Sequence, residues 1–556
     1  MNPRLYWLIP LLAGAAFRYW GINFGAPILS NLYIRPDESL VVVSGVEFAR
    51  HMGTPGTYAY PALFQQMAAL LSHLISSQPA HAFGLDPTPF YLAVRALAAA
   101  FGTATILLVY LIARRFLDQR WAAFAAVIYA VSPLAVRDAH FAVTDIPSVF
   151  FQTAVVWFAL RYLDAEPTKA RRELWLAALS LALSMCTKYA GLLLTSVLFT
   201  AAWLRARQRN EPFPWLFVGK LCAAAAVIFV AVNPYLFIHW DQAWEEIWSI
   251  VEVLYLWQPG DPAWSLPYAL WQFVKPLRHG IGGWLGLATG VAAIAWAVRR
   301  RDSRLLLVAQ PVLSTFLVLL PFQHTVPYRY LLPALPTLAV IVMVFVQRIS
   351  LRAPLAGAAA ALLLLLAPQA HTAFGFVHLL GFQDTRSQAG AWIQANVPSS
   401  TPIVWLGGPE CEPQFQESAA SVGRRIDFAY RRYGNISGAI VSAPYKLMKD
   451  AREREGRPGW EVYRNPPPDR MPAGEIYLVT PRYPLRMANF KPPVPESSLQ
   501  PAGDPVTFAS LAQGTWDGLE LDLIDAWFLP FRPLDGVLRP GPNLTIRRMI
   551  YRPPNP

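Results

Sequence analysis

Residues 214–238 read PWLFVGKLCAAAAVIFVAVNPYLFI, and this stretch decides the fold class of the chain. It is longer than the ~18 apolar residues that mark a helix able to cross a bilayer. It holds a single charged residue, Lys220, close to one end, where a lysine can reach the headgroups. Several other runs are similar, and of the 556 residues 54% are hydrophobic and only 15% are charged. A soluble chain carries about 25% charged residues, so the sequence predicts a polytopic α-helical membrane protein.

About eleven segments are expected to span the membrane: residues 4–23, 90–113, 121–136, 145–163, 174–187, 189–204, 214–238, 281–298, 304–322, 330–347 and 353–378. Segments 174–187 and 189–204 are each shorter than a full span, so one fused helix is the alternative there. Segment 60–76 is also apolar. We interpret it as a surface helix of a large first outer loop, because counting it as a span would invert the charge bias of every later loop.

Lysine and arginine gather in every second loop, and this pattern orients the chain. The rich loops are residues 114–120, 164–173, 205–212, 299–304 and 347–352. Short basic loops stay in the cytoplasm. We therefore expect a protein of the cell inner (plasma) membrane whose N-terminus lies in the cytoplasm. The first loop, residues 239–280 and everything after residue 378 are then outside. The formal net charge of +12 is thereby explained as a topological signal, and no nucleic-acid partner is expected.

The sequence also predicts a domain boundary. Residues 1–378 form the transmembrane module, and residues 379–556 form an extracytoplasmic α/β domain. In the latter, 384–398 indicate a helix that starts at an aspartate and stops at a proline. Strands are expected at 401–407, 474–481, 518–528 and 543–552, between turns rich in proline and glycine.

Ionisable residues gather at the predicted outer ends of the spans: Arg18, Asp37, Glu38, Arg95, Arg137, Asp138, His140, Asp145, Lys188, His324 and Arg329. A charge at the bilayer centre costs about 2.5–3.5 kcal/mol on insertion scales, so such residues usually serve a cavity. Grouped cations suit a phosphate at headgroup depth. A carboxylate beside them can remove a proton from a hydroxyl. Together they indicate transfer of a group from a lipid phosphate to an acceptor alcohol.

Each of these residues has a plainer interpretation as well. Asp37 follows a proline and suits a helix cap, and Glu38 is favourable in a first helical turn. His140 and His324 suit interfacial positions satisfied by water, and Lys188 and Arg329 suit anchors at span ends. Three tyrosines fit an aromatic belt as well as a sugar-stacking surface: Tyr60, Tyr189 and Tyr330.

An ordered set of motifs carries a family resemblance. They are RPDE (35–38), YAYPALF (58–64), SPLAVRDAHFAVTDIPSVFF (132–151), TKYAGLL (187–193), NPY (233–235) and RYLLPALP (329–336). In this order they resemble polyprenol-dependent glycosyltransferases of the C superfamily, nearest to bacterial protein O-mannosyltransferases and lipid A aminoarabinose transferases. The resemblance covers residues 1 to about 378, and the ending resembles the outer domain of bacterial members.

The resemblance implies roles for particular residues. Asp37 corresponds to the catalytic base, and Asp145 to the acidic residue that positions the acceptor or a metal, with Glu38 as a further catalytic candidate. Lys188 and Arg329 correspond to the residues that bind the donor phosphate, and His324 is a weaker match. Arg137 and Arg95 are further candidates for binding this phosphate, because they are cations at the predicted outer ends of spans and not because the resemblance implies it. Tyr60, His140, Tyr189 and Tyr330 are the substrate-binding candidates. Asp37, Glu38 and Asp145 are hard oxygen donors that suit Mg²⁺ or Mn²⁺, or act without a metal. The chain departs from many relatives at Tyr60-Pro61-Ala62, where they carry His-Pro-Pro or Lys-Pro-Pro.

Topology makes a lipid-linked donor the expected one. The cytoplasmic loops are too short for a nucleotide-sugar domain, and no Walker or GxGxxG motif stands in context. We therefore expect an inverting transfer of a hexose or pentose from a polyprenyl phosphate, with Asp37 as general base, to a lipid, glycan or protein acceptor of the cell envelope. The alternatives are a lipid or glycan transporter or flippase, a non-catalytic envelope assembly protein and, among enzymes, a polymer ligase or oligosaccharide transferase.

Overall fold

The computed structural model describes residues 5–32, 35, 37–50, 57–255, 264–322, 326–350, 355–456, 458–483, 493–512, 519–522 and 535–553. Contacts divide the chain into two compact units. Unit 1 holds Met1–Trp20, Thr57–Gln66 and Arg95–Gly375. Unit 2 holds Gly21–Gly56, Met67–Val94 and Phe376–Pro556. Much of the first outer loop thus belongs to one unit with the C-terminal segment, and the division at residues 378 and 379 stays a prediction.

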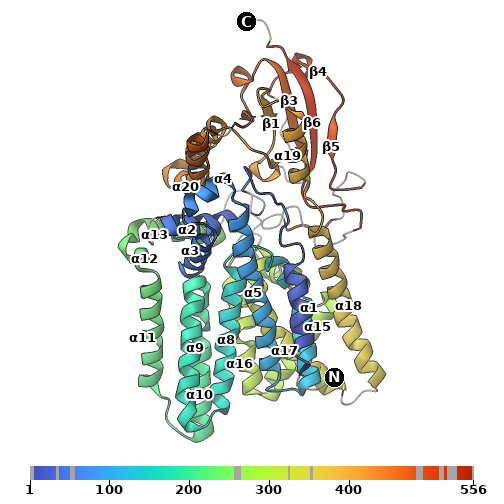
Figure 1. Ribbon diagram of the computed structural model, residues 1–556. Helices are drawn as coiled ribbons and strands as arrows, with labels where there is room; N and C mark the ends of the chain where they lie inside the picture. The colour runs from blue at the N-terminus through green and yellow to red at the C-terminus, as the bar shows by residue number, and fades with distance from the viewer. Residues whose placement is uncertain are drawn as a thin grey trace. The chain divides into compact units, whose positions relative to one another are not determined.

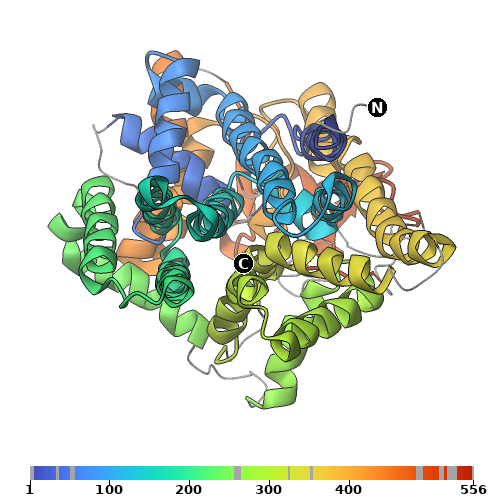
Figure 2. The same cartoon turned by 90° about the horizontal axis from the view of Figure 1, so that it is seen from below.

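Unit 1 is helical, and its long helices lie side by side in Figure 1 and are seen end-on in Figure 2. In chain order its helices are α1 (Leu8–Tyr19), α5 (Thr88–Ala113, which starts in unit 2), α6 (Gln119–Ala130), α7 (Pro133–Asp138), α8 (Asp145–Asp164), α9 (Pro167–Thr187), the 3₁₀ helix η2 (Tyr189–Leu194), α10 (Thr195–Arg209), α11 (Trp215–Val232), α12 (Pro234–Ile238), α13 (Trp240–Tyr255), α14 (Leu266–Leu277), α15 (Gly283–Arg300), α16 (Ser303–Leu319), the 3₁₀ helix η3 (Tyr328–Ala334), α17 (Leu335–Ser350) and α18 (Leu355–Leu380, which ends in unit 2).

Apolar length supports the membrane assignment. Each of the eleven expected segments contains a helix. Within the described residues, six helical stretches are long and apolar enough to cross a membrane: Thr88–Ala113, Asp145–Asp164, Tyr189–Arg209, Trp215–Val232, Tyr328–Ser350 and Leu362–Asn396. The count of eleven spans therefore stays a prediction. α9 and η2 are separated by an extended residue, Lys188, so segments 174–187 and 189–204 belong to separate helices.

Helix α8 is the central element of unit 1. It packs against α9 along its length and also contacts α10, η2 and η3. Its hydrophobic residues are distributed all round, and most of its side chains are buried. A helix that is apolar on every side is stable only when other helices surround it. This central position lets α8 present its first residue, Asp145, to both 3₁₀ helices.

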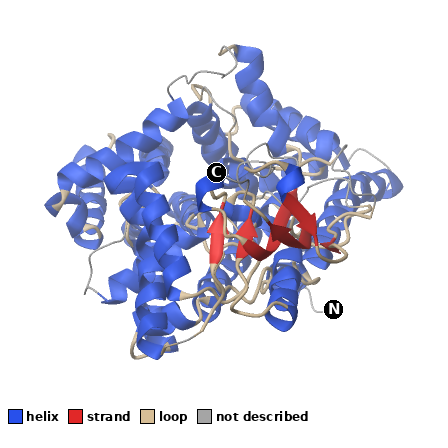
Figure 3. Cartoon of the chain, turned by 90° about the horizontal axis from the view of Figure 1, so that it is seen from above, coloured by secondary structure: helices blue, strands red, loops and turns tan. Residues whose placement is uncertain are grey.

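Unit 2 combines helices with a small mixed sheet (Figure 3). Its helices are α2 (Glu38–Arg50), α3 (Leu63–Ile75, whose first residues belong to unit 1), α4 (Pro79–Leu85), α19 (Thr385–Asn396), the 3₁₀ helix η4 (Pro409–Cys411), α20 (Ala419–Glu455), the 3₁₀ helix η5 (Pro468–Arg470) and the 3₁₀ helix η7 (Glu496–Ser498). Its strands are β1 (Ile403–Trp405), β2 (Val462–Arg464), β3 (Gly474–Arg482), β4 (Leu499–Pro501), β5 (Val506–Phe508) and β6 (Asn543–Tyr551). α3 confirms a helix in segment 60–76, while its place on the membrane surface stays a prediction.

The sheet has the strand order β2-β1-β3-β6-β4, with β5 also paired to β6. β1 pairs in parallel with β2 and β3, and β6 is antiparallel to β3. Successive side chains of a strand point to opposite faces. Accordingly, Ile403 and Trp405 pack in the core that includes α19, while Val404 packs in the core on the other face.

Several sequence predictions for this region are confirmed. A helix begins after Asp384, whose carboxylate accepts from the backbone N–H of Arg386, and strands lie within 401–407, 474–481 and 543–552. The expected strand at 518–528 lies outside the described residues except for 519–522. The strands at 462–464, 499–501 and 506–508 and the 37-residue helix α20 were not predicted.

Candidate active site

Three candidate residues of unit 1, Lys188, Arg329 and Tyr330, meet at Asp145, the first residue of α8. The Lys188 ammonium contacts its Oδ1, and the Nε of Arg329 lies 3.8 Å from its Oδ2. Tyr330 completes the group, with Lys188 Nζ 4.5 Å and Arg329 Cζ 5.6 Å from the centre of its ring. We call these four residues the Asp145 cluster. Its residues come from three segments that are distant in sequence. These segments contain AVTD (142–145), TKY (187–189) and RYLLP (329–333), which are parts of the motifs that carry the resemblance.

Local backbone geometry places each member of the Asp145 cluster. A carboxylate in the first turn of a helix is favoured by the helix dipole, which suits Asp145. Lys188 is extended (φ −151°, ψ 130°) between α9 and η2. Gly191 allows this sharp connection, because a Cβ there would lie 2.5 Å from Ser184 Oγ and 2.7 Å from the Ser184 carbonyl carbon. Arg329 and Tyr330 are consecutive residues of η3, which packs on α8.

Burial differs among the charged members of the cluster. The side chain of Asp145 is 3% exposed and that of Arg329 is 8% exposed, whereas Lys188 is 20% exposed. The cluster counts two cations against one carboxylate, a formal charge of +1. Partly buried positive charge with one partly exposed lysine side chain is an arrangement that can bind a phosphate, since desolvated cations attract anions more strongly than solvated ones do.

Other predicted phosphate ligands lie elsewhere in unit 1. Arg137 forms a buried ion pair with its neighbour Asp138, with the Nη2–Oδ2 distance 2.8 Å, at the end of α7. Arg95 is buried in α5. His324 lies outside the described residues. The roles proposed for these three residues stay predictions.

Arg18 and His140 contact backbone carbonyl groups. The Arg18 guanidinium donates to the carbonyl oxygens of Gly14 and Ala130, each at 3.0 Å. Cations are favoured near the carbonyl end of a helix, here the end of α6. The ring nitrogens of His140 lie 2.8 Å from the carbonyl oxygen of Val136 and 2.9 Å from that of Trp20. These contacts connect α7 to the end of α1.

Tyr60 and Tyr189 belong to a second polar group in unit 1. The hydroxyl of Tyr189 donates to the carbonyl of Tyr58 at 2.9 Å, and the carbonyl of Tyr60 accepts from Gln65 at 3.1 Å. The buried carboxylate of Glu246 accepts from the Thr57 hydroxyl and from the Tyr58 N–H, both at 2.7 Å. This group anchors the end of the first outer loop against α13.

Sequence reasoning did not find the anchoring role of Glu246 or of Asn233, whose Oδ1 accepts from the Ala62 N–H at 2.7 Å. The signal for Asn233 was present, since NPY is one of the motifs in the resemblance. Glu246 stands in WDQAWEEIW, an amphipathic acidic stretch of an outer loop, where a buried carboxylate cannot be told from its exposed neighbours.

Asp37 and Glu38 lie in unit 2, at the start of α2. Arg35 Nη1 is 3.9 Å from Asp37 Oδ2, and the Asp37 side chain is 21% exposed. Glu38 is buried and begins the helix. The partly exposed carboxylate of Asp37 is therefore the better placed of the two to meet a substrate.

The metal prediction depends on Asp37, Glu38 and Asp145. Among the described residues, no three or more histidine, cysteine or acidic residues form a group that could hold a metal ion. Asp145 itself contacts two cations, Lys188 and Arg329, which would repel a divalent ion. The surroundings of Asp145 therefore do not fit a metal ligand.

A comparison with protein families matches part of the chain. Residues 91–235 match the family model of dolichyl-phosphate-mannose-protein mannosyltransferase. Over these residues the match confirms the predicted resemblance to polyprenol-phosphate-dependent glycosyltransferases, and it includes Asp145 and Lys188. No curated protein matches the chain in sequence.

Several solved structures are loosely similar to this chain. ArnT from Cupriavidus metallidurans, bound to undecaprenyl phosphate, is 15% identical with a TM-score of 0.48, over 82% of this chain and 78% of that one. The oligosaccharyltransferase of Archaeoglobus fulgidus in its apo form is 12% identical with a TM-score of 0.47, over 86% and 69%. The Pmt1-Pmt2 complex of S. cerevisiae, bound to its sugar donor, is 18% identical with a TM-score of 0.34, over 44% and 34%.

Proposed function

We propose that this chain is a membrane glycosyltransferase that moves a hexose or pentose from a polyprenyl phosphate to an acceptor hydroxyl. The transfer takes place on the outer face of the membrane that holds the protein. The observation that carries the proposal is the Asp145 cluster, in which two cations from separate segments meet at the start of α8. It is supported by the family match, which covers two of the four cluster residues.

In this proposal the cations of the Asp145 cluster hold the donor phosphate. Lys188 supplies the ammonium of a partly exposed side chain, and Arg329 supplies a guanidinium whose planar donors suit phosphate oxygens. Asp145 acts as the residue that holds both cations in place. As the bond between the sugar and the phosphate oxygen breaks, negative charge grows on the leaving phosphate, and fixed cations stabilise it most at that stage.

Asp37 is the proposed general base. Its carboxylate takes the proton of the acceptor hydroxyl, whose oxygen attacks the anomeric carbon from the side opposite the phosphate. The sugar passes through a transition state with positive charge on the ring, as in glycoside hydrolysis, and the displacement inverts the anomeric configuration. Each residue named here has a role without a metal, and no step is assigned to one.

Orientation is part of the proposal. The basic loops indicate that Asp37 and the C-terminal segment face the outside of the cell, with the N-terminus in the cytoplasm. The experiment is to place single cysteines at Ser39 and at Arg301 in intact cells and label them with a membrane-impermeant reagent. We expect label only at position 39, and label only at position 301 would contradict the orientation.

The activity is tested by incubating purified protein with radiolabelled polyprenyl-phosphate sugars and host membrane fractions. We expect label to pass to a lipid, glycan or protein fraction. Asp37→Asn should lower the transfer rate by on the order of 10²–10⁴-fold. Asp241→Asn is the matched control, since Asp241 is an exposed acid in the first turn of α13.

Two results would contradict the proposal. A folded Asp37→Asn protein with the parental transfer rate would remove Asp37 from the role of base. Movement of labelled donor across vesicles without any labelled product would favour a transporter or flippase. An assembly protein would give neither product nor movement.

A further inference from the structure

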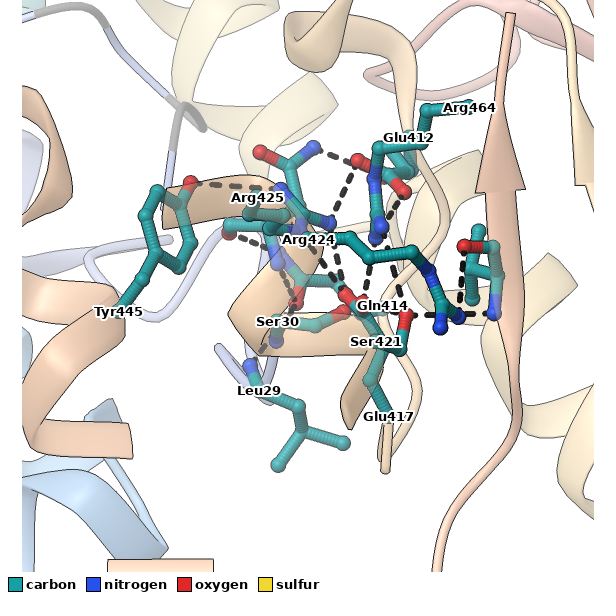
Figure 4. A network of polar contacts seen from close by, with 12 residues as sticks. Leu29, Ser30, Glu412, Gln414, Glu417, Ser421, Arg424, Arg425, Tyr445 and Arg464 are labelled. Carbon is teal, nitrogen blue, oxygen red and sulfur yellow. Dashed lines mark hydrogen bonds and ion pairs between the residues drawn. The ribbon is translucent and has the colours of Figure 1, made fainter. Parts of the chain in front are cut away.

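The segment that precedes Asp37 is held by one buried side chain from the C-terminal part of unit 2. Gln414 Oε1 accepts from three consecutive backbone N–H groups, those of Leu29 at 2.8 Å and of Ser30 and Asn31 at 3.2 Å each. Its Nε2 donates back to the carbonyl of Asn31 at 2.5 Å. A single amide thus binds both the donors and an acceptor of one short stretch, which Figure 4 shows beside the ion-pair network.

Two further contacts hold the same stretch. Asn31 Nδ2 donates to the carbonyl of Glu412 at 2.8 Å. The Arg452 guanidinium donates to the carbonyl of Leu29 at 3.2 Å and to that of Glu417 at 2.8 Å. The bonds to Asn31 and Leu29 join residues that are 381 and 423 positions apart in the sequence. Local sequence preference cannot produce them, so the C-terminal segment fixes this part of the loop.

Gln414 is itself held rigidly. Its backbone N–H donates to the carbonyl of Arg386 at 2.9 Å, and a Cβ at Gly390 would lie 1.7 Å from its carbonyl oxygen. Its neighbours Glu412 and Glu417 are both paired to the buried Arg425, at 2.6 and 2.7 Å. A side chain held on rigid surroundings positions its partner more precisely than one on a mobile loop does.

The described residues nearest to the held stretch are also fixed within unit 2. Leu32 is fully buried, Arg35 is buried, and the N–H of Glu38 donates to the carbonyl of Arg35 at 3.4 Å. α2 packs against α4 and α20. The helices beside α2 therefore constrain it, and residues 29–31, which precede it in the chain, are held by the C-terminal part of unit 2.

We propose that Gln414 is a positioning residue for Asp37, and that the C-terminal segment serves transfer by fixing the loop that carries the base. This inference rests on the proposed function. Gln414 touches no substrate in this account. It acts through residues 29–31, so its loss should lower kcat while the KM for the donor, whose phosphate contacts the Asp145 cluster, stays unchanged.

The test variant is Gln414→Met, which has similar length and no hydrogen-bonding group. We expect kcat to fall by about 10²-fold, the size of effect that a 1 Å displacement of a catalytic group can have. Hydrogen–deuterium exchange of peptides covering residues 25–50 should rise. Gln416→Met is the matched control, because Gln416 lies two residues away and is only partly buried. If Gln414→Met does not fold, Asn31→Ala removes the side-chain bonds to the carbonyls of Glu410 and Glu412 and should lower kcat by about tenfold or less.

A double-mutant comparison separates positioning from a general structural role. In the Asp37→Asn background, Gln414→Met should cause little further loss, because the group that it positions is already gone. An equal loss in both backgrounds, or parental kcat with raised exchange at 25–50, would overturn the inference. If Asp37→Asn has the parental rate, the proposed function fails instead. If Asp37→Asn is impaired while Gln414→Met is not, the positioning role alone fails.

Discussion

Two clusters of buried charge, one in each unit, differ in charge balance. The Asp145 cluster joins two cations to one carboxylate, and its Lys188 is partly exposed. The second cluster, which we call the Arg425 network, joins Glu412 and Glu417 to Arg425 and Arg464 through ion pairs. Its formal charge is zero, and Ser421 and Tyr445 add hydroxyl contacts (Figure 4).

The difference indicates what each cluster is for. A buried network with equal numbers of opposite charges holds elements together and contributes most when complete, since removing one partner strands the rest. A cluster with an excess of positive charge is suited to an anionic ligand. The difference in charge balance therefore predicts that substitutions in the Arg425 network lower stability and that substitutions in the Asp145 cluster lower activity.

The largest expected effect is on stability, from Arg425→Met. It leaves Glu412 and Glu417 buried without their shared partner, which should cost about 3–5 kcal/mol of folding free energy. The measurement is thermal unfolding in detergent. The control is Arg548→Met, whose pair with Glu475 is exposed on β6 and β3, and which should barely move the midpoint. Equal midpoints for the two variants would remove the structural role of the network.

Lys188→Met should have the next largest effect, and it should act on activity. We expect the transfer rate to fall by on the order of 10²–10³-fold, the usual effect of removing one group that stabilises developing charge. The unfolding midpoint should change little. Lys220→Met is the control, since that lysine is exposed on α11 and has no assigned role. A Lys188→Met protein that unfolds early, or that transfers at the parental rate, would break the comparison.

A smaller effect is expected from Gly191→Ala, which leaves every charge in place. The added Cβ would lie 2.5–2.8 Å from atoms of Ser184 and Met185, so η2 must shift and carry Lys188 away from Asp145. Overpacking of this kind costs roughly 1–3 kcal/mol. We expect about a tenfold lower transfer rate, in proportion to that strain. Gly219→Ala, with nothing within 4 Å of its Cβ, should be silent in the same assay.

The smallest expected effect is a pH dependence of unit 2. Burial by itself would raise the pKa of Glu417, but the guanidinium groups of Arg425 and Arg464 outweigh it and hold this pKa well below its usual value of 4.5. The folded-state pKa is thus depressed, so the stability is fully present above about pH 4.5 and is lost as the pH falls. Hydrogen exchange of α20, corrected for the intrinsic pH dependence of exchange, should be constant above about pH 4.5 and rise as the pH falls below it. Glu417→Gln should flatten this dependence, and an unchanged dependence would contradict the assignment.

Composition and the apolar segments predicted the helical architecture well, because apolar length is a local property of the sequence. Helices occupy all eleven expected segments, and Asp384 begins its helix where the cap pattern placed it. The small strands β2, β4 and β5 were missed, since three residues carry too little periodicity to be recognised. α20 was missed because its polar composition and internal Pro444 do not indicate a continuous helix.

The sequence predicted which residues belong to the candidate site better than it predicted which of them contact one another. Asp145, Lys188, Arg329 and Tyr330 were all candidates, yet nothing in their spacing shows that one carboxylate meets both cations. That pairing depends on how η2 and η3 pack on α8. The role of Gln414 could not be predicted from the sequence either. Its partners lie nearly 400 residues away, and the residues around it in the sequence form no motif.

The most direct test of the central claim is the binding of an undecaprenyl phosphate without sugar to purified protein in detergent, followed by fluorescence or calorimetry. The parental protein should bind saturably, and Lys188→Met and Arg329→Met should each weaken binding at least about tenfold, as loss of a charge-assisted contact predicts. Arg425→Met, measured below its unfolding temperature, should bind like the parent. Parental affinity in both cluster variants would contradict the claim that the Asp145 cluster holds a lipid phosphate.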